Sequence, residues 1–241
     1  MKKILALLLV LAMLLSFGGC GKRSNKIAEE IVREVDQMSD SEIEALVGDF
    51  ASAENEDSDY STTDFSLGEA IEDKYENEYI GIGFELPDDD WFFYDENQME
   101  ELNGIAMDVL SDEYREMLEA STVIYAMFAQ GRSGDNININ YEKLNGAQTV
   151  LNEEQYITIA TPTVEDSLRS AGAQNLTSEA TTVSIDGETF NALNLNYVLQ
   201  GVDVYQTIIA IKKDEYIANI TVTSIGGDVT DDLISYLYIV D

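Results

Sequence analysis

The sequence predicts an α+β fold in which an antiparallel β-sheet is flanked by helices, preceded by a signal peptide and an acidic helical stalk. The first observation is a succession of apolar alternating runs separated by the turn dipeptides Asp186-Gly187 and Gln200-Gly201. Strands joined by such short turns must be antiparallel. The second is three segments with apolar residues at helical spacing, which can cover the faces of the sheet.

The N-terminus resembles that of a secreted lipoprotein. A short positive segment, Met1–Lys3, precedes the apolar run Ile4–Phe17, which is shorter than the roughly 20 residues that a membrane-spanning helix needs. The small residues Gly18-Gly19 then precede Cys20, the one cysteine of the chain. This arrangement resembles a bacterial lipobox. We therefore expect residues 1–19 to be a lipoprotein signal peptide and Cys20 to be the lipid attachment site, carrying palmitate or a similar acyl chain.

The composition is strongly acidic. The 241 residues include 47 acidic and 13 basic side chains, a formal net charge of −34. Such a surface repels phosphates, so we expect no nucleic-acid partner. Lys22, Arg23 and Lys26 follow the expected anchor, where basic residues favour anionic lipid head groups.

Residues 20–64 are expected to form a lipid-anchored acidic helical stalk and linker. Apolar spacing predicts a short helix over residues 26–38, and Ser39 and Glu42 have the spacing of a capping box before a second helix. The segment 51–64 contains few large apolar residues, which is typical of a linker. The two helices either dock on the domain or a partner, or form a marginal stalk.

Residues 65–241 are expected to form the α/β domain. Phe65–Gly68 and Ile80–Leu86 alternate as an opening pair of strands. A helix is predicted over Gln98–Ala120 and a largely apolar strand over Val123–Gln130.

In the second half of this domain, Asn136–Tyr141 predicts a strand with one buried and one wet face. The helical region from Asn152 or Glu153 to Ala173 is expected to break near Pro162, because proline lacks an amide proton and clashes with the preceding turn. Asp228 is expected to open a terminal helix that contains Leu233 and Leu237. Four further strands are predicted: Thr181–Ile185, Thr189–Leu199, Val204–Ile211 and Tyr216–Thr223.

This order of elements resembles the PsbP-like fold, which is shared with Mog-type Ran-binding proteins. Phe65–Gly68, Tyr75–Ile82 and Leu86-Pro87 with Trp91 are also similar to the opening of lipoproteins from Firmicutes, in which Tyr-x-Asn-x-aromatic-x-Gly leads into a strand. The resemblance implies a PsbP-like α/β/α sandwich over residues 65–241. PsbP-like domains act as extrinsic, non-enzymatic subunits of membrane complexes, so it also implies a binding role and carries over no functional residue.

The absence of histidine excludes several kinds of catalytic site. Ser-His-Asp triads, Cys-His pairs and histidine-ligated zinc all need an imidazole, and the sequence has none. No phosphate-binding loop occurs, and Gly81 and Gly83 form half of a dinucleotide fingerprint inside a predicted strand. We expect no catalytic residue and no cofactor. Carboxylate pairs could still cleave glycosides, although 47 acids produce some pairs by chance.

Two acidic clusters partly match calcium ligands. Asp57, Asp59 and Ser61 occupy the first alternate positions of a calcium loop, but Thr62 stands where that loop needs glycine. Asp88–Asp90 is better explained as a solvated turn after a strand. We therefore expect no metal site.

Two further groups are candidates for ligand binding. Trp91–Tyr94 could form an exposed aromatic platform, although strand alternation favours two side chains in the core and two outside. Six asparagines on two predicted strands could form a polar surface for carbohydrate, and covering helices would argue against it: Asn136, Asn138, Asn140, Asn191, Asn194 and Asn196. A plain wet sheet face is the alternative.

Together these features favour a membrane-anchored extracytoplasmic lipoprotein with a non-catalytic binding or assembly role and a protein partner at the cell envelope. The alternative is a cell-surface lipoprotein that binds a small molecule, glycan or cation, and a carboxylate-dependent hydrolase is the third. Convergent polar groups would favour the ligand-binding alternative, whereas an exposed apolar patch at a sheet edge would favour assembly.

Overall fold

The structure is a computed structural model that describes residues 65–103, 123–144 and 146–240, all within one compact unit. The predicted signal peptide, Cys20, the stalk and the acidic segment Asp57–Ser61 lie outside the described residues. So does most of the predicted helix Gln98–Ala120. In the described part of the chain, no helix is long and apolar enough to cross a membrane.

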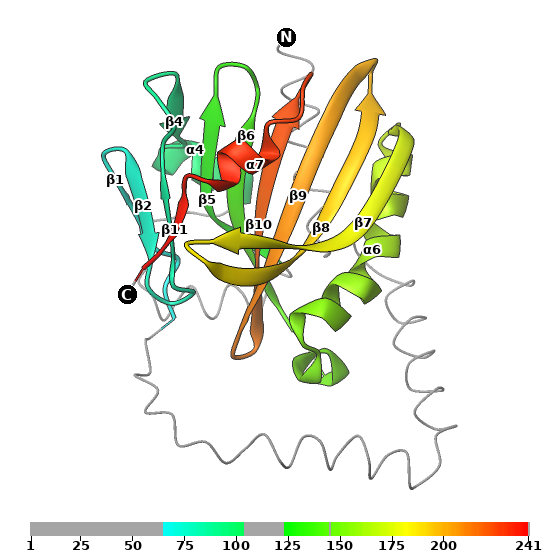
Figure 1. Ribbon diagram of the computed structural model, residues 1–241. Coiled ribbons are helices and arrows are strands. Elements are labelled where there is room, and N and C mark those ends of the chain that lie inside the picture. Colours follow the sequence, from blue (N-terminus) through cyan, green and yellow to red (C-terminus); the bar gives the residue numbers. More distant parts are fainter. Residues whose placement is uncertain (1–64, 104–122, 145, 241) are drawn as a thin grey trace, which may run out of the picture. The chain divides into compact units, whose positions relative to one another are not determined.

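A large sheet of seven antiparallel strands dominates the fold, in the order β4-β5-β6-β10-β9-β8-β7 (Figure 1). In that order the strands are Trp91–Phe93, Val123–Gly131, Asn136–Lys143, Tyr216–Ile225, Val202–Lys213, Glu188–Leu199 and Gln174–Ile185. Both predicted turn dipeptides, Asp186-Gly187 and Gln200-Gly201, have positive φ at both residues, as tight hairpin turns require. The predicted hairpins are therefore confirmed.

Four short strands form a second antiparallel sheet in the order β1-β2-β3-β11. In that order they are Glu69–Ile71, Lys74–Asn77, Ile82–Glu85 and Leu237–Ile239. The predicted strand Phe65–Gly68 is wrong, because these residues form a loop in which Phe65 and Leu67 are buried without ladder hydrogen bonds. The predicted terminal helix is also shorter than expected, since α7 spans Thr230–Ile234 and Leu237 begins β11.

The two sheets pack face to face around the main hydrophobic core. Ile82 and Phe84 of the small sheet lie in one cluster with Ile139 and Ile220 of the large sheet. The antiparallel pairing that the sequence predicts is confirmed, but on this face a second sheet, rather than a layer of helices, covers the large one. The predicted strand Ile80–Leu86 contains β3 and is confirmed, whereas the three- and four-residue strands β1, β2 and β11 leave no periodic signal in the sequence.

Helices pack on the opposite face of the large sheet. The helix α6, Glu153–Ser170, packs against β7, β8 and β9, and α4, Glu96–Asn103, packs against β5. A short 3₁₀ helix, η1 at Gly146–Val150, precedes α6. By the strand order, β6 and β10 run between α4 and α6 (Figure 1).

The helix α6 continues through Pro162, so the predicted break is wrong. Buried side chains anchor the helix to the sheet on both sides of the proline, Tyr156 and Ile157 before it and Val164 and Leu168 after it. Losing a helical hydrogen bond at an interior proline costs about 3 kcal/mol. Burial of four such side chains offsets that cost, at about 1.5–3 kcal/mol for each apolar side chain.

The Tyr-x-Asn-x-Tyr motif forms a hydrogen-bond network in the core between the sheets. The Asn77 amide donates to the hydroxyls of Tyr75 and Tyr141 at 2.9 and 3.0 Å, and its oxygen accepts from the backbone N–H groups of Tyr79 and Ile80 at 3.1 and 3.3 Å. The tyrosine hydroxyls in turn donate to carbonyls of the loop before β1. The motif therefore holds that loop against the turn between β2 and β3.

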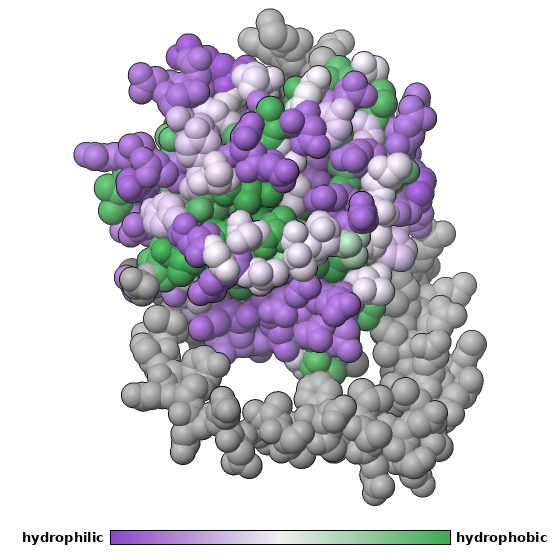
Figure 2. Space-filling model, in the orientation of Figure 1, coloured by the Kyte–Doolittle hydropathy of each residue, from purple (hydrophilic) through white to green (hydrophobic). Residues whose placement is uncertain are grey.

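The hairpin of β7 and β8 curls across the front of the domain, and its tip reaches β11 (Figure 1). There the Asp186 carboxylate accepts a hydrogen bond from the Ile239 N–H at 2.9 Å. Figure 2 shows apolar residues gathered between α7 and this crossing hairpin, within a face that is otherwise largely hydrophilic. The hairpin thus closes one side of the core.

Candidate functional site

Nine buried polar side chains lie together on the helix-facing side of the large sheet, and we call them the polar patch. They come from the strands β5, β6, β9 and β10, and each is at most 8% exposed: Gln130, Asn136, Asn138, Asn140, Glu142, Gln206, Asn219, Thr221 and Thr223. Alternate residues of β6 and β10 face the other sheet and are apolar, among them Ile139 and Ile220. The patch is therefore the polar half of a strict two-residue period.

Strand register arranges the patch in rows across the sheet. The rows are Gln130–Asn136–Thr223–Gln206, Asn138–Thr221 and Asn140–Asn219. The β6 members run from Asn136 to Glu142, a length of about 20 Å at 3.3 Å per residue. The patch is thus an elongated strip along two central strands.

Apolar and aromatic side chains flank the patch on both sides. On the β5 side, Met99 and Leu102 of α4 cluster with Tyr125 and Phe128. On the β9 side, α6 packs on a second cluster that includes Tyr197. The patch is therefore a polar strip bordered by two apolar clusters.

Two tyrosines, one on α6 and one on β8, form hydrogen bonds with side chains at the borders of the patch. The Tyr156 hydroxyl donates to Glu142 Oε2 at 2.8 Å and accepts from Asn219 Nδ2 at 3.2 Å. The Tyr197 hydroxyl donates to Gln206 Oε1 at 2.8 Å, and Gln206 Nε2 donates to Thr223 Oγ1 at 3.0 Å. These bonds fix the orientation of the side chains nearest to α6 and β8.

Some polar atoms of the patch are not satisfied. Three buried amide atoms have no hydrogen-bond partner among the described residues, namely Asn136 Oδ1, Asn138 Nδ2 and Asn219 Oδ1. Each such buried atom costs about 1–3 kcal/mol when unpaired. The patch can therefore accept two further hydrogen bonds, at Asn136 and Asn219, and donate one from Asn138.

Glu142 is the one acidic member of the patch. Burial raises the pKa of its carboxyl from 4.5 to about 7, and the hydrogen bond from Tyr156 partly opposes that rise. Burial and the nearby Glu142 charge also raise the pKa of Tyr156 well above its ordinary value. A two-carboxylate hydrolase needs a second acid about 5–9.5 Å from the first. Glu142 is the one acid among the nine patch residues, so the patch by itself does not contain such a pair.

The structure places the six predicted asparagines differently from the expected wet surface. Asn136, Asn138 and Asn140 do gather, but they are buried, so the prediction of a wet face on this strand is wrong. On β8, Asn194 lies on the opposite face of the sheet, where its oxygen accepts from Thr207, and Asn196 is exposed. Sequence alternation cannot distinguish a polar face covered by other groups from one covered by water.

Six patch members were not predicted from sequence. The alternation of Asn219, Thr221 and Thr223 in the terminal hairpin is a signal that could have identified three of them. Their pairing with β6 could not be read from it, because β6 and β10 are distant in sequence.

The aromatic segment Trp91–Tyr94 follows the expected alternation in part, because Tyr94 packs on Phe128 with ring centroids 4.5 Å apart and is half-buried rather than exposed. Trp91 and Phe93 contact Phe84 in the core, with ring centroids 6.4 and 6.1 Å apart. Phe92 is 43% exposed and stacks on Tyr94. The segment is therefore core and edge packing with one exposed ring.

The acidic cluster Asp88–Asp90 forms a turn before β4. The Asp90 N–H donates to Asp88 Oδ1 at 2.8 Å, and the Asp90 carboxylate pairs with Arg132 at 2.9 Å. Across the described ranges, no group of three or more potential ligands is placed to hold a metal ion.

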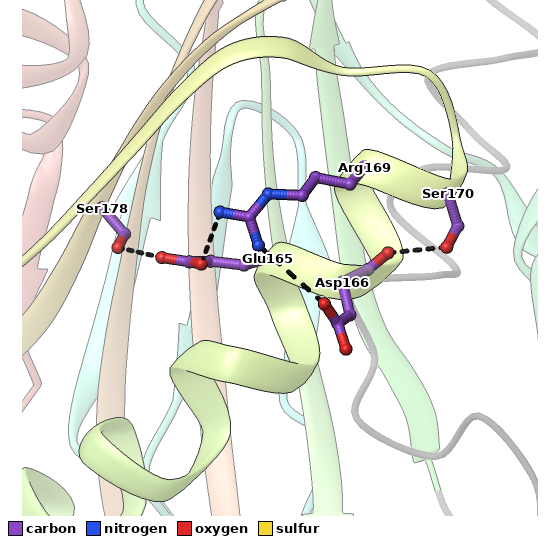
Figure 3. A network of polar contacts seen from close by, with 5 residues as sticks. All are labelled: Glu165, Asp166, Arg169, Ser170 and Ser178. Carbon is purple, nitrogen blue, oxygen red and sulfur yellow. Dashed lines mark hydrogen bonds and ion pairs between the residues drawn. The ribbon is translucent and has the colours of Figure 1, made fainter.

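A separate polar network ties α6 to β7 (Figure 3). The Glu165 carboxylate accepts from Ser178 of β7 at 2.5 Å and from Arg169 at 2.7 Å. The Ser178 hydrogen bond, followed by that from Arg169, lowers the pKa of Glu165. Arg169 also lies 3.9 Å from Asp166. All the partners are surface groups that position the helix.

Comparison with protein-family models and with curated proteins finds no match for the chain.

Proposed function

We propose that this chain is a lipid-anchored extracytoplasmic lipoprotein that binds a ligand at the polar patch without chemically changing it. The observation that carries the binding role is the set of three unpartnered amide atoms on Asn136, Asn138 and Asn219. The observation that supports the anchor is Cys20 after Gly18-Gly19 at the end of an apolar leader.

Buried polar groups without hydrogen-bond partners destabilise a fold, so their presence favours a role other than folding. Three unpaired atoms cost on the order of 3–9 kcal/mol in total, which is comparable to the net stability of a typical domain. Apolar residues at the same positions would avoid that cost. A ligand that completes the hydrogen bonds recovers part of it on binding.

The PsbP-like resemblance belongs to the same proposal. Its support is the series of long antiparallel hairpins and the packing of α6 on one face of the sheet. A PsbP-like domain held at the membrane by an N-terminal tether would work as an extrinsic binding module.

The binding role is tested on the full chain, purified from membranes in a zwitterionic detergent. The unfolding temperature is measured against a library of neutral, cationic and anionic small molecules, for the wild type and for Asn138→Leu. We expect at least one compound to raise the unfolding temperature of the wild type alone and to be recovered unchanged by mass spectrometry. A converted compound, or an equal response from Asn138→Leu, contradicts the proposal.

The anchor is tested by metabolic labelling with alkyne-tagged palmitate. We expect the wild type to carry the label on the peptide that begins at Cys20 and Cys20→Ser to carry none. Label that persists in Cys20→Ser would contradict the anchor while leaving the binding role intact.

A protein-assembly role is the second candidate, and two apolar side chains favour it. Ile71 on the edge strand β1 is 60% exposed, and Phe92 on the edge strand β4 is 43% exposed. Exposed apolar edges are where strands and partner proteins add. A stoichiometric partner that co-purifies with the wild type, but not with the Ile71→Ser, Phe92→Ser double variant, would support this role.

A further inference from the structure

We infer that the outer edge of β7 binds an extended segment of a basic partner protein, in which apolar and basic side chains alternate. The segment adds to the large sheet as a further strand, which requires an open edge and no cavity. Three features support this site: the unpaired backbone groups of β7, the apolar surface beside them and the charges around both. The site is separate from the polar patch, so its failure leaves the proposed ligand binding untouched.

The strand β7 lies at one end of the large sheet, and among the described strands it pairs with β8 alone. Across the two-residue turn Asp186-Gly187, Ile185 and Glu188 form a hydrogen-bonded pair, so every second residue of β7 directs its backbone groups away from β8. These residues are Ser178, Ala180, Thr182 and Ser184. No described residue pairs with their N–H or C=O groups, which are therefore available to another strand.

The sequence of β7 lacks the features that usually prevent edge pairing. Edge strands are commonly protected by lysine, by proline or by a bulge. This strand contains no lysine, arginine or proline, and its one charged residue is Glu179. Its pairing with β8 shifts register between Gln174 and Thr177 and then continues without a break to Ile185. The unbroken stretch is longer than the usual strand of about five or six residues, so a partner strand can pair along it.

Apolar side chains adjoin one side of this edge. Val183 and Phe190 lie opposite each other on β7 and β8, are half-buried and pack against the main core. Val229 and Tyr236, which flank α7 in the sequence, are 39% and 37% exposed, and Figure 2 shows apolar residues gathered between α7 and the hairpin. On the other side of β7, Thr182 is exposed. An added strand alternates in the same way, so one row of its side chains meets apolar groups and the other meets water.

The charges around the edge favour a basic partner. Glu179 and Glu188 are exposed and lie on the same side of the sheet as Val183. Two further exposed acids, Asp231 and Asp232, lie on α7. Neither residues 174–211 nor residues 214–241 contain a lysine or an arginine. A second copy of the chain would bring the same acids and a net charge of −34, so charge complementarity favours a basic partner over self-association.

The test uses the full chain in a zwitterionic detergent and three labelled peptides of seven residues. The first alternates lysine and valine, the second has glutamate in place of lysine, and the third is the lysine peptide with proline in place of its central valine. Fluorescence anisotropy measures the affinity of each. We expect the lysine peptide to bind at least about tenfold more tightly than the other two, because glutamate meets like charge and proline cannot donate a backbone hydrogen bond.

The matching change in the protein is Thr182→Pro. It removes an outward N–H of β7 and leaves the hydrogen bonds to β8 in place, because Thr182 directs its backbone groups away from β8. We expect its affinity for the lysine peptide to fall at least about tenfold. The control Thr182→Ala keeps the N–H and should change the affinity less than about twofold. Ala180→Pro repeats the test at a second outward residue, and circular dichroism identifies any variant that unfolds.

Binding of the lysine peptide that the folded proline variants retain overturns the inference, and so does equal binding of the glutamate peptide. The absence of binding by all three peptides overturns it as well. Sedimentation of the chain without peptide tests self-association. A dimer that Thr182→Pro abolishes would show that β7 pairs with a second copy of the chain, and the basic partner would then be wrong.

Discussion

Buried polar side chains lie against both faces of the large sheet, but on one side alone are they fully hydrogen-bonded. On the side of the small sheet, Asn77 of β2 is fully buried, with all its side-chain polar atoms hydrogen-bonded. On the face toward the helices, Asn138 is 2% exposed and its amide nitrogen has no hydrogen-bond partner among the residues that the structure describes. The same residue type therefore stabilises the fold on one side of the sheet and is left without this stabilisation on the other.

The difference follows from how each group is assembled. Asn77, Tyr75 and Tyr79 are neighbours in sequence, so one turn brings donors and acceptors together in a fixed geometry. The patch is built from four strands, and its central members are mostly amides and hydroxyls of similar length on a flat face. Neighbouring strand side chains that point the same way cannot all reach one another.

The largest expected effect comes from Asn77→Leu. The variant leaves the backbone N–H groups of Tyr79 and Ile80 unpaired and removes a donor from two tyrosines, which we expect to lower the free energy of unfolding by about 4 kcal/mol. Chemical denaturation measures it. The matched control is Asn138→Leu, which should cost less than about 1 kcal/mol because its amide nitrogen makes no hydrogen bond. Equal losses in the two variants would remove the contrast between the faces.

Gly68→Ala tests the same network from the loop side. Gly68 has a φ of 75°, and an added Cβ would lie 2.6 Å from the Glu76 carbonyl oxygen and 2.6 Å from the Tyr75 hydroxyl. We expect a loss of about 3 kcal/mol, from left-handed backbone strain together with overpacking. Gly187→Ala is the control, because a Cβ there meets no atom within 4 Å although φ is also positive. A loss no larger than that of the control would show that the loop is not held tightly.

Glu142→Gln sharpens the contrast through pH. Below pH 4.5 the carboxyl is protonated in both the folded and unfolded states, and above about 7 it is ionised in both. Between these values the folded state binds the extra proton, so the free energy of unfolding falls as the pH rises, by about 3 kcal/mol in total. We expect Glu142→Gln to remove this decline and to be more stable than the wild type at pH 8.

Denaturation curves of both proteins at pH 5 and pH 8 measure the effect. At pH 5 the two proteins should differ by less than about 1 kcal/mol, because glutamine resembles the protonated acid. A wild type that is equally stable at both pH values would contradict the buried, proton-binding state of Glu142.

The smallest expected effect is that of Arg169→Gln. Its ion pair with Glu165 joins residues four apart on the exposed side of α6, and such pairs contribute about 0.3–0.5 kcal/mol. Added salt should shrink the difference between variant and wild type. A loss above about 1 kcal/mol would mean that the surface network in Figure 3, rather than the buried side chains of α6, holds the helix on the sheet.

The hairpins of the large sheet were predictable because each turn signal lies between strands that are adjacent in sequence. In the small sheet, β3 was predictable from the alternation of Ile80–Leu86. The other short strands were not, since Lys74–Asn77 has no periodic signal and Leu237–Ile239 pairs with a segment from the other end of the domain. Pro162 misled the helix prediction because tertiary packing overrides a local preference. One third of the patch was predictable, through the three asparagines of β6, and the rest depends on strand pairing that the sequence does not reveal.

The strand β11, near the C-terminus, completes the small sheet by pairing with β3, a strand from the N-terminal part of the domain. A chain synthesised from its N-terminus therefore exposes an unpaired edge of β3 until Ile239 has emerged. Unpaired edges are the sites at which nascent chains pair with wrong partners. The domain thus has to remain protected for nearly the whole of its synthesis, and loss of β11 alone would leave a chain that folds its long hairpins and still aggregates.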